Sequence, residues 1–145
     1  MATTTATINI TSDIPSTPII ISNTMTMTKD QSTTGLEETT GLRTKKFGTV
    51  TTAAVIAEHD ELTDDKAHKM YIRNTSASKT NYFFVAYNAS AAATGTTETI
   101  GKLYGGDWML FPYDGNTNIT VASDGGIEQT LEYMVFADGI VVATG

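Results

Sequence analysis

Eleven of the twelve aromatic residues of this 145-residue chain follow residue 70, and Phe47 is the only one before it. Aromatic side chains supply the largest buried area per residue, so their distribution indicates where a hydrophobic core can form. Threonine is distributed in the opposite way, with 17 of 28 threonines in the first 52 residues. Such a segment favours extended backbone but buries little area by itself. The sequence therefore predicts an aromatic-rich domain preceded by a threonine-rich segment that binds a partner.

The later part of the chain consists of short β-branched and aromatic runs separated by turn residues. Such runs cover residues 45–50, 53–57, 69–74, 81–87, 98–103, 108–113, 118–122, 129–136 and 140–143. Turn residues about every eight to twelve positions between short strands are typical of an antiparallel sandwich or barrel. We therefore predict an all-β fold, with an antiparallel β-sandwich or jelly-roll-like domain over residues 44–145.

Residues 1–43 are predicted to form an extended N-terminal arm. Ala6–Ile10, Ile19–Ile21 and Thr24–Thr28 have strand-like patterns, but none is long enough to be stable alone. We expect this arm to become ordered only against a partner. Its apolar residues are the expected partner-binding anchors: Ile19, Ile20, Ile21, Met25, Met27, Leu36 and Leu42.

The charge and cysteine content exclude several classes of protein. The net charge is −7, and residues 58–145 hold twelve acidic and five basic residues, so we expect no nucleic-acid partner. The absence of cysteine excludes disulfides and thiolate chemistry. The sequence shows neither a secretory signal nor an apolar run of the roughly 20 residues that span a bilayer. We expect a protein made in the cytosol, with no membrane partner.

An acidic segment, residues 58–68, contains both histidines, His59 and His68. Imidazole and carboxylate groups are ligands for divalent cations, but the spacing matches neither His-Glu-x-x-His nor a calcium loop. We interpret the segment as a solvated loop in which Thr63 caps a short helical turn, with surface calcium as the alternative. We expect no cofactor and no metal site.

The sequence also lacks the motifs of nucleophilic catalysis. Neither histidine lies in a recognisable nucleophile motif, and Gly-x-Ser-x-Gly is absent. The glycine pairs at 105–106 and 125–126 do not have the pattern of phosphate-binding loops. We therefore expect a protein that is not an enzyme.

Residues 102–113 form the most distinctive segment. Strand alternation places Trp108 and Leu110 on one face and Met109 and Phe111 on the other, so both faces are apolar. This pattern predicts a central strand with a buried Trp108, or a strand with one face covered by a neighbouring subunit. The candidate core or interface residues are Tyr104, Trp108, Phe111 and Tyr113. The alternative is a sugar-stacking platform formed by Trp108, Tyr104 and Tyr113.

Three segments resemble small structural proteins of tailed bacteriophages. They are Lys69-Met70-Tyr71-Ile72-Arg73-Asn74-Thr75-Ser76, the stretch from Ile100 to Pro112 with Gly105-Gly106-Asp107-Trp108 at its centre, and Glu132-Tyr133-Met134-Val135-Phe136. The pattern is similar to that of capsid decoration, or cement, proteins with a β-sandwich fold.

This resemblance implies a non-enzymatic virion protein assembled in the host bacterial cytoplasm. Its partners would be the major capsid protein or neighbouring virion subunits, and a homo-oligomer, for instance a trimer on a capsid three-fold axis, would suit the lattice. A tail or fibre component and a carbohydrate-binding adhesin module are the alternatives.

Overall fold

The computed structural model describes residues 3–14, 16–87 and 99–141, and it confirms the all-β prediction. The strands have the following bounds: β1 Thr4–Ser12, β2 Ile19–Met27, β3 Glu38–Thr39, β4 Arg43–Phe47, β5 Ala53–Ala57, β6 His68–Asn74, β7 Tyr82–Tyr87, β8 Thr99–Tyr104, β9 Trp108–Tyr113, β10 Ile119–Ser123 and β11 Gln129–Ala137. A single 3₁₀ turn, η1 His59–Glu61, is the helical element among these residues. Within the described ranges, no helix is long and apolar enough to cross a membrane.

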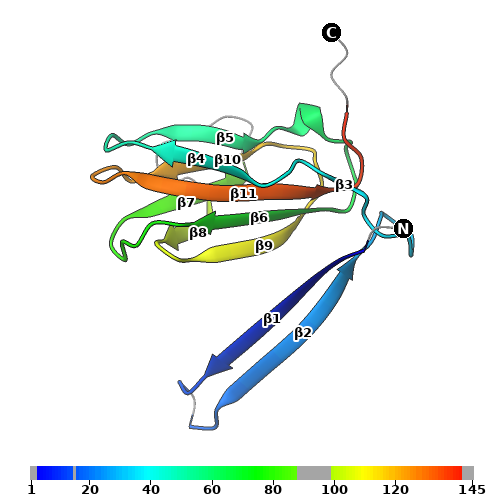
Figure 1. Ribbon diagram of the computed structural model, residues 1–145, viewed down its shortest axis with the longest axis horizontal. Helices are drawn as coiled ribbons and strands as arrows, with labels where there is room; N and C mark the ends of the chain where they lie inside the picture. Colours follow the sequence, from blue (N-terminus) through cyan, green and yellow to red (C-terminus); the bar gives the residue numbers. More distant parts are fainter. Residues whose placement is uncertain (1–2, 15, 88–98, 142–145) are drawn as a thin grey trace.

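Eight strands, β4 to β11, form a two-layer sandwich, and the two-residue strand β3 is added to one of its sheets (Figure 1). One sheet has the order β5-β10-β7-β8, and the other has the order β3-β11-β6-β9 with β4 also paired to β11. The chain pairs β4 with β11, β5 with β10, β6 with β9 and β7 with β8, all antiparallel. The first four sandwich strands therefore pair with the last four in reverse order, which is the wrapped double hairpin of a jelly roll.

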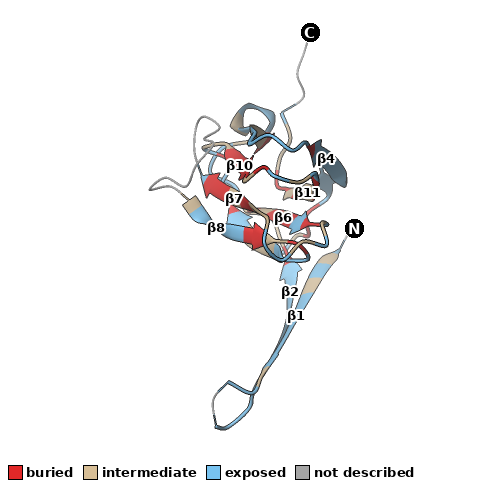
Figure 2. Ribbon diagram, turned by 90° about the vertical axis from the view of Figure 1, so that its left-hand side faces the viewer, coloured by how far each residue is buried: buried red, intermediate tan, exposed pale blue. Residues whose placement is uncertain are grey.

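The core lies between the two sheets, where each strand directs alternate residues inward. Phe47 and Phe83 meet edge to face across it, with ring centroids 4.8 Å apart. The largest fully buried apolar side chains include Met70, Ile72, Ile119 and Leu131. Figure 2 shows this buried interior and the contrasting exposure of β1 and β2.

Buried polar side chains also connect the two sheets. Asn74 on β6 donates from Nδ2 to the Leu103 carbonyl on β8 at 3.0 Å and to Gln129 Oε1 at 3.1 Å. Gln129 donates in turn to Asp124 Oδ1 at 2.9 Å. Paired in this way, Asn74 and Gln129 avoid the penalty of an unsatisfied buried amide.

The structure differs from the expected arm in residues 1–43. Residues 4–27 form a two-stranded hairpin, β1–β2, that extends away from the sandwich (Figure 1). The following segment joins the sandwich before residue 44, because β3 pairs with β11 and Leu36 is 2% exposed. Pairing gives the two marginal strands mutual hydrogen bonds, which neither could have as a single extended segment.

Two local predictions are also wrong. The helical turn η1 ends before Thr63, and Glu58, without a side-chain cap, precedes it. Strand β4 ends at Phe47 rather than continuing to Val50, which is exposed. The first residue of the predicted strand at 98–103 and the end of the predicted strand at 140–143 lie outside the described residues.

Candidate partner-binding surface

The β1–β2 hairpin is amphipathic. Its register runs from Thr4 opposite Met27 to Ser12 opposite Ile19, and residues directly opposite each other share a face. One face, here called the apolar face, carries Ala6, Ile8, Ile10, Ile19, Ile21, Met25 and Met27, together with Thr4, Ser12 and Asn23. The other, the threonine face, carries Thr5, Thr7, Asn9, Thr11, Ile20, Ser22, Thr24 and Thr26. Its side chains hydrogen-bond across the strands, as in the 2.8 Å contact between the Thr7 and Thr24 hydroxyl groups.

The apolar face is buried at the base of the hairpin and open along the rest of its length. Met27 is 2% exposed, whereas the five residues beyond it are between 38% and 44% exposed: Ile8, Ile10, Ile19, Ile21 and Met25. Asp13 is the one charged residue between positions 3 and 28. A contiguous exposed apolar surface of this kind marks an interaction site.

The base of the hairpin is attached to the sandwich by specific contacts. The Leu36 amide donates to the Met27 carbonyl at 3.2 Å, and both side chains are buried. Asp138, after β11, accepts at Oδ2 from the Asp30 amide at 2.6 Å and from the Ala67 amide at 3.3 Å. The position of the hairpin is therefore set by the fold.

A groove separates the hairpin from the outer face of the five-stranded sheet. The sheet contributes Tyr71, Trp108, Leu110, Met134 and Phe136. Two adjoining hollows, of about 280 and 320 Å³, lie between these residues and the hairpin, which contributes residues 5–8, 23–25 and 27. Both walls of the groove are thus largely apolar.

Trp108 lies on the outer wall of this groove and is 51% exposed, so the prediction of a buried tryptophan is wrong. The alternation predicted for residues 108–113 is confirmed, since Phe111 packs against the core and Tyr113 belongs to it. The error has a topological cause. Strand β9 lies at the edge of its sheet rather than at the centre, and its outward face carries Trp108 and Leu110.

The expected anchors and aromatic residues therefore separate into distinct places. Ile19, Ile21 and Met25 come together on the apolar face, whereas Ile20 lies on the threonine face and is 76% exposed. Met27 and Leu36 are buried within the chain, and Leu42, at 60% exposed, lies between β3 and β4. Five of the seven anchors are thus available to a partner.

The three aromatic residues of the alternative sugar platform do not share one surface. Tyr113 is buried, and its hydroxyl donates to the Thr117 carbonyl at 2.6 Å. Tyr104 lies in the four-stranded sheet, opposite the sheet that carries Trp108, and it packs on Tyr82 of the same sheet with ring centroids 5.2 Å apart. The neighbouring carboxylates are also engaged, because Asp107 accepts from the Tyr104 amide and Asp114 accepts from the Tyr87 hydroxyl. Trp108 is left beside the groove with apolar neighbours.

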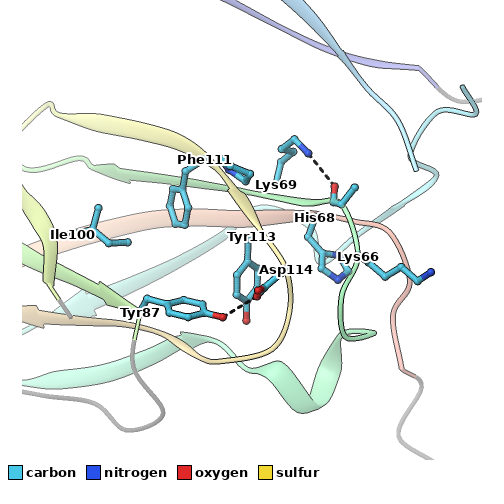
Figure 3. A pocket seen from close by; sticks show the side chains of 10 residues that line it. Lys66, His68, Lys69, Tyr87, Ile100, Phe111, Tyr113 and Asp114 are labelled. Atoms are coloured by element: carbon cyan, nitrogen blue, oxygen red, sulfur yellow. Dashed lines mark hydrogen bonds between the residues drawn. The ribbon is translucent and has the colours of Figure 1, made fainter. Parts of the chain in front are cut away.

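A separate hollow, of about 520 Å³, lies away from the groove beside Tyr87, between Ile100 and the segment from Lys66 to Lys69 (Figure 3). Tyr87 donates to Asp114 Oδ1 at 2.8 Å, and Lys69 donates to the Ala67 carbonyl at 3.1 Å. Burial first, and the hydrogen bond to Asp114 next, raise the pKa of Tyr87 above its usual value. Burial likewise raises the pKa of Tyr113. Both phenols are therefore protonated at neutral pH, and neither can act as a base.

His68 borders this hollow but is fully buried. Its Nδ1 accepts from the Asp138 amide at 2.9 Å, so its Nε2 donates to the Thr63 carbonyl, 2.8 Å away. With both ring nitrogens engaged, His68 is a structural residue that holds the end of β11. His59 is instead on the surface, 3.1 Å from Asp60. Among residues 3–14, 16–87 and 99–141, no three His, Asp or Glu side chains are placed to hold a metal ion.

Several structurally important residues were not indicated by the sequence. Asp138 precedes a turn glycine, and Asn74 and Gln129 each lie between polar neighbours, so only their partners reveal their roles. Lys102 is another, with its ammonium group 4.5 Å from the ring centre of Tyr82. The hairpin itself had a signal, because residues 6–10 and 24–28 both alternate and Pro15 and Pro18 lie between them.

Comparison of the chain with protein-family models, with curated proteins and with solved structures found no match.

Proposed function

We propose that this protein is a non-enzymatic structural subunit of a tailed-phage particle, most similar in role to a capsid decoration protein. In this role it binds a neighbouring virion subunit through the N-terminal hairpin. The observation that carries the proposal is the hairpin's apolar face, on which five large side chains remain about two-fifths exposed.

The kind of surface supports binding rather than catalysis. An amphipathic β-hairpin whose two strands carry no charged residue offers a partner apolar side chains on one face and backbone hydrogen-bonding groups along both of its strand edges. The rigid sandwich and the fixed base present this hairpin in a defined direction. A jelly roll occurs in viral capsid proteins but also in lectins and cupins, so the fold supports the proposal only by analogy.

Fractionation of phage particles from the strain that carries this gene tests the proposal. Antibodies raised against the purified chain should detect it in density-gradient bands of intact virions and of tail-less heads. Detection with isolated tails alone would favour a tail or fibre role, and absence from every particle band would overturn the proposal.

Hairpin variants test the binding surface in the same experiment. Ile21→Asp places a carboxylate on the apolar face, whereas Thr26→Asp places one at an exposed position of the threonine face. Particles should retain the Thr26→Asp protein and lose the Ile21→Asp protein, because burying an unpaired carboxylate is costly. Equal retention of the two variants would show that the apolar face is not the contact.

A further inference from the structure

The hairpin and the sandwich together form a hook whose inner surfaces are both apolar. Met27, on the apolar face, is buried at the base of the hairpin. From this base the hairpin diverges from the sandwich toward its tip (Figure 1). The opposite wall is the outer sheet face around Trp108 and Leu110.

We propose that two copies of this chain clasp each other through these hooks, related by a two-fold axis. The inference rests on the proposed function in taking the hairpin as a binding element, and it assigns the neighbouring subunit as a second copy of the same chain. Each hairpin enters the partner's groove, and the two apolar faces pack on each other. The threonine face near each tip then covers the outer sheet face of the partner.

Side-chain size along the hairpin favours this antiparallel arrangement. The half near the tip carries the large residues Ile10, Ile19 and Ile21, whereas the half near the base carries Thr4 and Ala6 beside the flexible Met25. A two-fold axis places the tip half of one hairpin over the base half of the other. Large side chains then lie against small or adaptable ones, as well-packed interfaces require.

The clasp also accounts for two exposed residues outside the apolar face. Ile20 is the apolar residue of the threonine face, lies next to the tip and is 76% exposed. Trp108 is 51% exposed on the outer sheet face. In the clasp, the tip of each hairpin reaches the partner's outer sheet face, and therefore Ile20 meets the surface around Trp108 and Leu110.

The distribution of charge makes a second copy the fitting occupant. The chain carries a net charge of −7, so two copies repel each other over most of their surfaces. The outer face of the five-stranded sheet is different: Lys46 is paired with Glu128 at 2.9 Å, and Lys69 and Arg73 against Glu132 leave a net of +1. The hairpin brings to this positive face a single acidic residue near its tip, Asp13.

The area is sufficient for a stable pair. Each strand has nine residues, which at about 3.3 Å per residue and about 4.8 Å between strands gives roughly 300 Å² for each hairpin face. The apolar face, the tip half of the threonine face and an equal area of sheet wall then bury roughly 600 Å² per copy and about 1,200 Å² in total, at the lower end of the range of specific interfaces.

The mass of the purified full-length chain, measured by light scattering after size-exclusion chromatography across a dilution series, tests the clasp. Wild type should have twice the chain mass of 15.5 kDa. Ile21→Asp should weaken association by more than about tenfold, because the clasp would bury its carboxylate. Thr26→Asp, near the base of the threonine face and outside the contact, should remain dimeric. Circular dichroism shows whether both variants retain the fold.

A disulfide trap gives a second readout that does not depend on loss of association. The chain has no cysteine, so Ile20→Cys combined with Trp108→Cys should yield a covalent dimer under oxidation. Either single variant alone should not form the same cross-linked species.

A monomeric wild type, a trimer mass, or a dimer that survives Ile21→Asp would overturn the clasp. A monomer whose Ile21→Asp variant is still lost from particles would leave the proposed function standing, with a different virion subunit in the groove. Retention of Ile21→Asp on particles together with a monomeric wild type would contradict both.

Discussion

Replacing Trp108 with alanine tests whether the outer face of β9 is open in the isolated subunit. A fully buried tryptophan covers about 150–250 Å². Because Trp108 is 51% exposed, about half of that area is buried within the chain. At about 25 cal/mol per Å², and allowing for a compact unfolded state, the expected loss is about 2 kcal/mol. Burial in the core would give about 3–5 kcal/mol instead.

The measurement requires a monomeric background and an internal control. In the Ile21→Asp chain, which the clasp predicts to be monomeric, urea unfolding followed by circular dichroism gives the free energy of unfolding. Circular dichroism replaces fluorescence here because Trp108 is the single tryptophan. Phe83→Ala, at a fully buried position in contact with Phe47, should cost about 3–5 kcal/mol. A Trp108→Ala loss equal to that of Phe83→Ala, or one below about 0.5 kcal/mol, would refute the reasoning.

Three further perturbations address the base of the hairpin, the buried phenols and the polar core. Asp138→Ala should cost about 1–3 kcal/mol and speed amide exchange at Asp30 and Ala67, whose donors lose their acceptor; unchanged exchange at both amides would contradict this. Burial raises the pKa values of Tyr87 and Tyr113, so their contribution to stability is fully present below about pH 10 and is lost as pH rises through the folded-state values. The melting temperature should fall as the pH rises through that range, and it should fall less steeply for Tyr87→Phe than for wild type. Identical slopes for the two proteins would count against a raised pKa of Tyr87. A double-mutant cycle on Asn74→Ala and Gln129→Ala should give a coupling energy of about 1 kcal/mol, whereas additive losses would show that their 3.1 Å contact contributes nothing.

The strands of the sandwich could be predicted from the sequence because their cause is local. Residues 53–57 and 108–113 form strands with the predicted bounds, and 129–136 differs from β11 by one residue. In each, β-branched or aromatic residues occur between turn residues, so the side-chain alternation and the positions of the turn residues indicate the same strand. The core faces of these strands follow from the same alternation.

The outward face of β9 could not be predicted, because its environment is set by strand order. Both faces of residues 108–113 are apolar in sequence, which fits a central strand with two covered faces. In the jelly roll this strand pairs with β6 on one side only. Whether Trp108 is covered therefore depends on what lies over the sheet, and the local pattern carries no information about a neighbouring layer.

The environment of the whole hairpin, like that of the outward face of β9, is not determined by its local sequence. An isolated two-stranded sheet is marginally stable in water, because the hydrogen bonds between its two strands offset little of the conformational entropy lost on ordering. Within the chain, Met27 is the one apolar-face residue that is fully buried, and the large residues beyond it keep about two-fifths of their surface exposed. Most large apolar residues of the two nine-residue strands nevertheless lie on one face, with Ile20 as the exception, and such an exposed apolar face is typical of an interaction surface. The sandwich covers only the base, and in the proposed clasp the hairpin of a second copy covers the rest.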